Sequence, residues 1–279
     1  MSNKIGNFFK NNYIREKTHL SERKLLRNIK KGFDNQEFKM YLQFIVDSKD
    51  NKIASAETLS RWENASGEVV FPGTYIGIME KSGLITRFDY YMFEKVCQKL
   101  SQWKDSKLCD VSLSCNLTRI TISEKGFADK IKNIANKYDF DRSKLIIEIT
   151  EDSLENNLVI AMFNIIEIKK LGFRIALDDI GSGYTSLVSL CEYPIDVVKI
   201  DREILLLART EKGKKLLMGI VSLAHYLNLK VVCEGVETDE QNKLVTNSNC
   251  DYIQGWYYSK ALSETMAEKF AIDYINKAI

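Results

Sequence analysis

Acidic side chains recur inside or directly after short apolar runs of this sequence, where carboxylates are uncommon. Ile, Leu and Val flank most of them, and carboxylates in such surroundings are rarely buried unless they are paired. One amide and one amine occur in equivalent places, so the group has acidic, amide and cationic members. The five carboxylates are Glu57, Glu148, Asp178, Asp179 and Glu234, and the amide and amine are Asn116 and Lys199.

This combination indicates a site for divalent cations. Like charges that lie close together cannot all stay ionised without compensation, and one lysine is too little. No His or Cys belongs to the group, and oxygen ligands favour Mg²⁺ or Mn²⁺ over Zn²⁺. The adjacent pair Asp178 and Asp179 suggests a carboxylate shared by two metal ions, an arrangement used to displace phosphodiesters in line. The two histidines, His19 and His225, lie in a polar tail and a predicted helix and are not catalytic candidates.

Eight apolar runs rich in β-formers must position these residues. Segments with helical periodicity separate most of the runs, including residues 154–171 and a long amphipathic stretch over 203–227. Gly172 and Asn228 stand where such helices should end. Strands that alternate with helices predict a parallel sheet, and eight repeats in 279 residues predict a closed (β/α)8 barrel, which typically needs about 250 residues. The eight runs are residues 39–46, 52–62, 111–118, 144–150, 174–180, 197–201, 230–236 and 252–255.

The first connection departs from the regular barrel plan. Only the residues DSKDN separate the first run from the second, whereas a parallel crossover needs a dozen residues or more. We therefore predict a modified TIM-type barrel whose first strand is antiparallel. The stretch 63–110 has room for two or three helices, and residues 21–33 begin with a Ser and a Glu typical of a helix start. We expect residues 1–20 to be a tail or the remnant of a linker, and residues 21–279 to form one domain.

Composition excludes several classes of protein. The chain has 40 basic and 38 acidic residues, a net charge of +2, so electrostatics gives no case for binding nucleic acid or a membrane surface. No apolar run approaches the roughly 18 residues that span a bilayer, and the first residues lack the apolar core of a signal peptide. The six cysteines form no CxxC pair, as in proteins of a reducing compartment. We expect a cytoplasmic protein.

Each candidate residue also has a purely structural explanation. An isolated Glu at a strand end is commonly a salt-bridge partner, Asp178 and Asp179 could form a turn and helix cap, and Lys199 could belong to a structural ion pair. Their shared position argues for function, because the carboxyl ends of barrel strands form the active face of such enzymes. Seven of the eight runs carry such a polar residue at their carboxyl end.

The order and spacing of these residues resemble those of EAL domains over about residues 25–269. The motif that gives the family its name appears as ETLSR, residues 57–61, and the asparagine strand appears as SCNLT around Asn116. The motif IEITE is intact at 147–151, the Asp-Asp loop begins DDIGSG at Asp178, and Lys-Ile-Asp is intact at 199–201. EGVET follows from Glu234, and Gln254-Gly255 matches the last motif.

The resemblance implies a bacterial signalling enzyme that hydrolyses cyclic di-GMP to linear pGpG with two Mg²⁺ or Mn²⁺ ions. It implies that Glu57, Asn116, Glu148 and Asp178 hold one metal, and that Asp178 and Asp179 hold the second. Glu234 would ligate a metal or act as a base, Lys199 would orient the attacking water or hold phosphate charge, and Glu151 would brace the loop after Asp179. A homodimer and an upstream sensor or GGDEF (diguanylate cyclase) domain are also implied. The residues implied to bind the dinucleotide are Gln43, Leu59, Arg61, Pro72, Asp201 and Gln254.

Four positions depart from the family pattern, and none of them is a candidate metal ligand. They are Phe44, Thr58, Ile180 and Ala261. Thr58 replaces an alanine, and its side chain should point away from that of Glu57 on the strand. Two alternatives remain open from the sequence: a barrel that binds cyclic di-GMP without cleaving it, and an unrelated barrel enzyme, such as an aldolase that forms a Schiff base on Lys199.

Overall fold

The computed structural model describes residues 21–150, 158–181 and 189–277. The chain forms two compact units. Unit 1 comprises residues 1–39 and 60–85, and unit 2 comprises residues 40–59 and 86–279. The strands β1 (Phe38–Asp47) and β2 (Ile53–Glu63) each contribute residues to both units.

Unit 1 has a small aromatic core. It contains a helix over residues 21–34, as predicted, the short strand β3 (Val69–Val70) and the helix α2 (Pro72–Ser82). The rings of Phe38, Trp62 and Tyr75 pack against one another with centroids 5.4 to 6.1 Å apart. Pro72 stands in the first turn of α2, where its missing N–H costs no hydrogen bond.

Unit 2 is built on a closed barrel of eight strands. The neighbour order is β1-β9-β8-β7-β6-β5-β4-β2, and a pairing between β1 and β2 closes the ring. β1 pairs with β9 antiparallel, whereas the pairs from β2 round to β9 are parallel. The predicted barrel with an antiparallel first strand is therefore confirmed. The remaining barrel strands are β4 (Ser112–Asn116), β5 (Leu145–Thr150), β6 (Arg174–Ile180), β7 (Val197–Ile200), β8 (Lys230–Cys233) and β9 (Tyr252–Gln254).

A tight turn reverses the chain between β1 and β2. The Asp47 carboxylate accepts a hydrogen bond from the Lys49 backbone N–H at 2.8 Å, and Asp47 N–H donates to the Lys52 carbonyl. Asn51 adopts a left-handed conformation with φ of 56°, which asparagine tolerates better than most residues. This local chemistry makes β2 return alongside β1, so a hairpin replaces the usual helical crossover.

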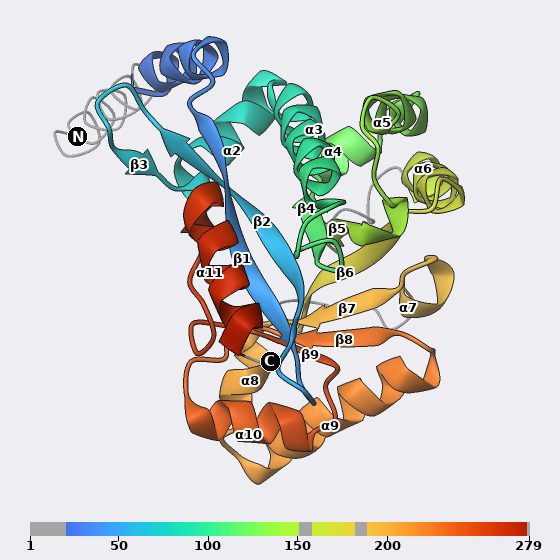
Figure 1. Ribbon diagram of the computed structural model, residues 1–279. Coiled ribbons are helices and arrows are strands. Elements are labelled where there is room, and N and C mark those ends of the chain that lie inside the picture. The colour runs from blue at the N-terminus through green and yellow to red at the C-terminus, as the bar shows by residue number, and fades with distance from the viewer. Residues whose placement is uncertain (1–20, 151–157, 182–188, 278–279) are drawn as a thin grey trace, which may run out of the picture. The chain divides into compact units, whose positions relative to one another are not determined.

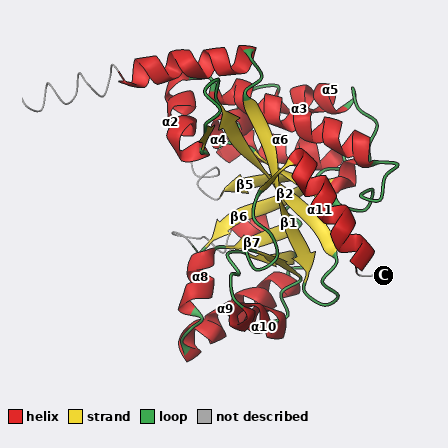
Figure 2. Cartoon of the chain, turned by 60° about the vertical axis from the view of Figure 1, so that its left-hand side comes forward, coloured by secondary structure: helices red, strands yellow, loops and turns green. Residues whose placement is uncertain are grey.

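Helices of unit 2 lie outside the ring of strands (Figures 1 and 2). As predicted, the stretch 63–110 contains two helices, α2 followed by α3. One short strand, β10 (Leu262–Ser263), adds to the outer edge of β1. The helices are α3 (Ile85–Trp103), α4 (Arg119–Ile122), α5 (Phe127–Ala135), α6 (Leu158–Lys170), α7 (Ser189–Glu192), α8 (Arg202–Leu207), α9 (Glu211–Tyr226), α10 (Asp239–Asn247) and α11 (Glu264–Lys277), with a 3₁₀ turn at Arg142–Lys144.

The long helix predicted over residues 203–227 is wrong in one respect, because two helices occupy this stretch. Thr210 interrupts it by accepting a hydrogen bond from the Gly213 N–H at 3.0 Å, which caps the start of α9. A Cβ on Gly213 would lie 1.9 Å from the Leu207 carbonyl oxygen, so the two helices meet at a close backbone contact. The predicted helix ends at Gly172 and Asn228 are confirmed, with φ of 95° and 61°.

Two properties expected from composition can be compared with the structure. Within the described ranges, no helix is both long and apolar enough to cross a membrane. All six cysteines are free thiols: four are buried, and Cys109 and Cys191 are exposed.

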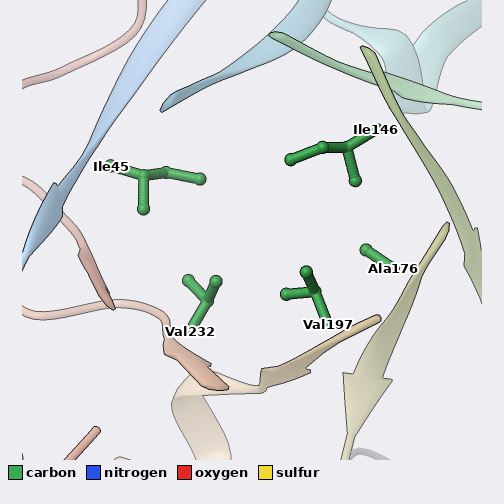
Figure 3. Close-up of a cluster of buried hydrophobic side chains, with 5 residues drawn as sticks. All are labelled: Ile45, Ile146, Ala176, Val197 and Val232. Atoms are coloured by element: carbon green, nitrogen blue, oxygen red, sulfur yellow. The ribbon is translucent and has the colours of Figure 1, made fainter. Parts of the chain in front are cut away.

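The barrel interior changes from apolar to charged along four neighbouring strands, β5 to β8. Side chains two residues apart face the same side of a strand. The inner layer of Ile146, Ala176, Val197 and Val232, together with Ile45, is apolar (Figure 3). Two residues further along the chain stand Glu148, Asp178 and Lys199, which lie on β5, β6 and β7, and Glu234, which directly follows β8. The alternation of the strands therefore delivers four charged side chains to the carboxyl end of the barrel.

Candidate active site

One lysine ammonium lies among four carboxylates in unit 2. Nζ of Lys199 is 2.7 Å from Glu234, 3.2 Å from Glu148, 3.3 Å from Asp178 and 3.5 Å from Glu57. The lysine side chain is only 2% exposed, so water screens these contacts weakly. The structure thus brings together five residues that the sequence placed on five different strand ends.

Two amide side chains hold Glu57 from either side. Nδ2 of Asn116 donates to Oε1 of Glu57 at 3.2 Å, and Nε2 of Gln254 donates to Oε2 at 2.6 Å. Burial alone would raise the pKa of Glu57, but Lys199 and these two donors outweigh it and lower the pKa. Glu57 is therefore a carboxylate with a fixed orientation and a favoured charge.

The other carboxylates are less well compensated. Burial raises the pKa of Glu148 well above its usual range, and the neighbouring Glu57 and Asp178 add to this effect. Burial, opposed by Lys199, raises the pKa of Glu234 to about 7. Oε1 of Glu234 lies at ion-pair distance from Lys199 but has no well-directed hydrogen bond. The cluster thus carries more negative charge than its one lysine neutralises.

The oxygen atoms of this cluster are of the type that binds a hard divalent cation, although they do not form a preorganised coordination site. Among the described residues, no three Asp, Glu, His or Cys side chains form such a ready-made ligand group, and the carboxylates surround the Lys199 ammonium instead. The donor atoms are carboxylate and amide oxygens, which Mg²⁺ and Mn²⁺ prefer. A bound cation would also offset the excess negative charge of the cluster.

Lys199 is unsuited to act as an amine nucleophile here. Burial by itself would lower its pKa, but the carboxylates, Glu148 foremost, outweigh burial and hold the pKa well above its ordinary value. A Schiff-base enzyme needs a lysine that loses its proton near neutral pH. The surroundings of Lys199 therefore argue against the aldolase alternative.

A local irregularity of β6 presents the Asp-Asp pair. The pairing of β6 with β7 shifts register between Leu177 and Ile180, and Asp179 has a left-handed φ of 62°. A bulge of this kind redirects side chains and is common beside active sites. Asp178 faces Lys199, and its Oδ1 also accepts a hydrogen bond from the Asp179 N–H at 2.9 Å. Burial and the Asp178 charge raise the pKa of Asp179.

A groove of about 250 Å³ opens beside this cluster. Gln43, Leu59 and Gln254, all expected to contact a dinucleotide, line it together with Glu57 and Glu234. Nε2 of Gln43 donates to the Ser259 carbonyl at 3.2 Å, which orients its side chain. The groove therefore joins three predicted binding residues to the charged cluster.

The groove also contains residues that are absent from the predicted site. Arg202 and Trp256 line it, and Arg202 forms an ion pair with Glu237 at 3.0 Å. Arg202 directly follows the Lys-Ile-Asp motif and Trp256 directly follows Gln254-Gly255, so proximity to a motif was the available signal. Periodicity could not reveal them, because both lie just past the strand ends.

The remaining predicted residues fall outside this cluster. Arg61 and Pro72 belong to unit 1, where the Arg61 guanidinium donates to the Ser60 carbonyl and stacks 4.7 Å from the Phe71 ring centroid. Asp201 caps α8 by accepting from the Glu203 N–H at 2.7 Å, a structural role that the sequence did not reveal. Glu151 lies outside the described residues.

Comparison with known proteins agrees with this geometry. Residues 26–261 match the EAL domain family. The chain is 30% identical over 260 residues to the signaling protein YkoW of Bacillus subtilis, covering 93% of this chain and 32% of YkoW. It is 28% identical to MucR of Pseudomonas aeruginosa, a bifunctional diguanylate cyclase/cyclic di-GMP phosphodiesterase, over 85% of this chain and 35% of MucR. The chain spans about a third of the length of these curated relatives.

Solved structures show the same barrel. The PaMucR phosphodiesterase in complex with c-di-GMP superposes with a TM-score of 0.82 at 27% identity, covering 88% of this chain and 99% of that one. The EAL enzyme Bd1971, bound to cAMP and cyclic di-GMP, gives a TM-score of 0.85 at 26% identity, covering 91% of this chain and 70% of that one. With a family match over most of its length and these structural neighbours, the chain belongs to the EAL domain family.

Proposed function

We propose that this protein hydrolyses one phosphodiester of cyclic di-GMP to give linear 5′-pGpG, and that it uses two Mg²⁺ or Mn²⁺ ions. The observation that carries the proposal is the buried cluster of Glu57, Glu148, Asp178 and Glu234 around Lys199 beside an open groove. The chain has a carboxylate or amide at every position that we propose as a metal ligand. This favours an enzyme over a barrel that binds cyclic di-GMP without cleaving it.

The donor set suggests which residues would hold the ions. Glu57, Asn116, Glu148 and Asp178 would hold one ion, and Asp178 and Asp179 would hold the second. When bound, the ions would supply Lewis acidity toward the phosphate and favour deprotonation of water. Lys199 would keep its charge among these carboxylates, where it would orient the attacking water and offset phosphate charge.

Glu234 is the residue we assign to proton transfer. Its pKa of about 7 is suited to a group that takes up a proton near neutral pH. The oxygen of water would bond to phosphorus while its proton passes to a carboxylate oxygen of Glu234. The bond from phosphorus to the 3′ oxygen of one guanosine would break, and that oxygen would take up a proton. The product keeps its second phosphodiester and gains a 5′ phosphate.

The groove residues would bind the substrate. Gln43, Leu59 and Gln254 line the groove in unit 2, and we propose the same role for Arg61, Pro72 and Asp201. The rigid donor fork of Arg61 suits a phosphate. Glu151 would support the loop that follows Asp179.

We also propose that two copies of this chain associate through α6. Val159 and Phe163 are 83% and 61% exposed, and they line a shallow, mostly apolar hollow together with Met162, Ile166, Tyr193 and the charged Glu192. A contiguous apolar face of this kind on a helix commonly marks a protein interface. In signalling, residues 21–279 would act as the phosphodiesterase domain, under an upstream sensor or GGDEF domain.

One incubation tests the proposed reaction. Purified protein, cyclic di-GMP and Mn²⁺ are mixed, and the nucleotides are separated by chromatography over time. The proposal expects pGpG to accumulate as the first product, without early GMP. Tight binding of cyclic di-GMP with no product at any time would instead show a receptor.

A further inference from the structure

Asn116, a proposed ligand of the first metal ion, lies where the chain leaves the barrel. It is the last residue of β4 and is exposed, so packing restrains its side chain little. Its Nδ2 donates to Oε1 of Glu57 at 3.2 Å, and its amide oxygen Oδ1 is the atom that could bind a cation. The direction of Oδ1 therefore depends on how firmly the backbone on either side of Asn116 is held.

Strand pairing holds the backbone up to Asn116. Cys115 is paired on both sides, with β2 and with β5, and Asn116 itself is paired with Glu148. Directly afterwards, the Leu117 N–H donates to the Glu148 carbonyl at 3.1 Å. The chain then turns away from the sheet into α4, a helix of four residues whose N-cap is Thr118. From Thr118 onward, the backbone needs an anchor other than the sheet.

A buried carboxylate of α3 provides this anchor. Asp89 is only 3% exposed, and its Oδ2 accepts hydrogen bonds from the Thr118 N–H at 2.9 Å and from the Thr118 hydroxyl at 2.6 Å. The Thr121 hydroxyl donates to the same oxygen at 2.5 Å. Hydrogen bonds to a carboxylate are stronger than those between neutral groups. Three donors on one oxygen therefore fix Thr118, two residues after Asn116.

The helix that carries Asp89 is itself firmly packed. Its neighbours Phe88, Met92 and Phe93 on α3 are buried, and the Phe93 ring packs edge-on against that of Phe173, with centroids 5.9 Å apart. Side chains in such a closely packed interior have little room to move. Asp89 thus ties the chain after β4 to a rigid helix, although the proposed hydrolysis gives it no role.

A second buried side chain holds the other end of α4. Nδ2 of Asn164, on α6, donates to the Ile122 carbonyl at 2.6 Å and to the Glu124 carbonyl at 3.0 Å. Asn164 is 3% exposed, like Asp89, but the carbonyls that it holds lie six and eight residues after Asn116. The two side chains therefore anchor the same short helix, and only Asp89 anchors the end next to the proposed ligand.

We propose that Asp89 is a positioning residue for metal binding, which acts through Thr118 to set the direction in which Asn116 presents its amide oxygen to the first metal ion. The inference rests on the proposed function, in which Asn116 is a metal ligand. Residues that orient the ligands of a metal commonly change its affinity 10–100-fold when they are replaced.

The test measures Mn²⁺ affinity without substrate, by a titration in which electron paramagnetic resonance detects the free ion. Asn116→Ala identifies the binding step that depends on the amide. Asp89→Leu is similar in size but removes the acceptor, and it should weaken this step about tenfold. Asp89→Asn keeps an acceptor oxygen and should stay within about threefold of the wild type.

Asn164→Ala is the matched control for a purely structural effect. It leaves two carbonyls at the far end of α4 without this donor, so it should lower stability in urea unfolding as Asp89→Leu does. Its Mn²⁺ affinity should remain within about twofold of the wild type, because the change is remote from Asn116. Circular dichroism checks that each variant is folded. If Asp89→Leu is unfolded, Thr118→Val replaces it, since it removes one of the three donors and should weaken Mn²⁺ about threefold.

A double-mutant cycle tests whether Asp89 acts through Asn116. Asp89→Leu, or Thr118→Val in its place, should cause no further loss of Mn²⁺ affinity when Asn116 is already alanine. The inference is overturned if the wild type binds no Mn²⁺, if Asp89→Asn loses as much affinity as Asp89→Leu, if Asn164→Ala weakens Mn²⁺ equally, or if the loss is the same with and without Asn116. A wild type that binds Mn²⁺ but does not hydrolyse cyclic di-GMP would overturn the proposed function alone, because these affinities do not depend on turnover.

Discussion

The ammonium of Lys199 lies 2.7 Å from the carboxylate of Glu234 and joins strand β7 to the residue that directly follows β8. The same ammonium contacts three further carboxylates, so Lys199 is the local counter-ion of the whole cluster. In the proposed enzyme, metal ions share this role. Lys199 should therefore matter most when metal is absent.

Replacing Lys199 with Met tests this dependence. Removing one partner of a buried charge network leaves the others uncompensated, at a cost of about 3–5 kcal/mol. Denaturant unfolding in EDTA should show a loss of this size, and Mn²⁺ should restore more stability to the variant than it adds to the wild type. Lys169→Met is the control, because its pair with Asp196 is about one-quarter exposed and should contribute about 1 kcal/mol or less. Equal losses in the two variants would contradict the counter-ion role.

Metal removal should abolish turnover. The cluster has four carboxylates and one ammonium, so the phosphate of a substrate would meet net repulsion without cations. After treatment with EDTA, Mg²⁺ or Mn²⁺ should restore hydrolysis of cyclic di-GMP, and Ca²⁺ should restore it poorly because it takes more ligands at longer distances. Full turnover in excess EDTA would rule out the two-metal proposal.

Gly255 should tolerate no side chain. A Cβ at this position would lie 1.9 Å from the Val236 carbonyl oxygen, where the chain after β9 passes the loop after β8. Gly255→Ala should destabilise the protein by about 1–3 kcal/mol or more and distort the groove that holds Gln254. Gly219→Ala is the matched control: it lies in α9 with nothing within 4 Å, and it should stabilise by about 0.5–1 kcal/mol. Urea unfolding of the two variants compares them directly.

The sequence predicted the barrel because its signals are local and repeated. Apolar runs rich in β-formers identified all eight barrel strands, and the five-residue link at 47–51 identified the antiparallel hairpin. Short edge strands such as β3, with Val69, were missed because two residues carry no period. The break between the two helices within residues 203–227 was missed because the helical pattern of apolar residues continues through it. Only the N-cap residue Thr210 marks the start of the second helix.

The site was predictable in membership but not in geometry. Strand ends indicated that Glu57, Glu148, Asp178 and Glu234 converge, but the position of Lys199 between them depends on how neighbouring strands are staggered. The sequence underestimated Lys199, which contacts every one of these four carboxylates. Arg202 and Trp256 follow strand ends and fill the groove through loop conformation, which no periodic pattern encodes.

The apolar face of α6 should mediate a homodimer. Phe163→Asp places a charge in the centre of this face, where desolvation would oppose association. Light scattering should show a dimer for the wild type and a monomer for the variant. Ile272→Asp, at a 36% exposed position on α11, is the control and should leave the dimer intact. A wild type that stays monomeric at high concentration, with full activity, would remove both the dimer and any regulatory role for it.

The most direct test of the central claim compares Glu234→Gln with Arg61→Ala in two assays, affinity for cyclic di-GMP in Ca²⁺ and turnover in Mn²⁺. Glu234→Gln keeps the size of the side chain but removes its charge and proton acceptor, so turnover should fall about 10²–10⁴-fold while affinity stays near that of the wild type. Arg61→Ala should chiefly weaken affinity through loss of a phosphate contact. If the wild type binds cyclic di-GMP tightly without turnover and Glu234→Gln changes nothing, the protein is a receptor and the proposed hydrolysis is wrong.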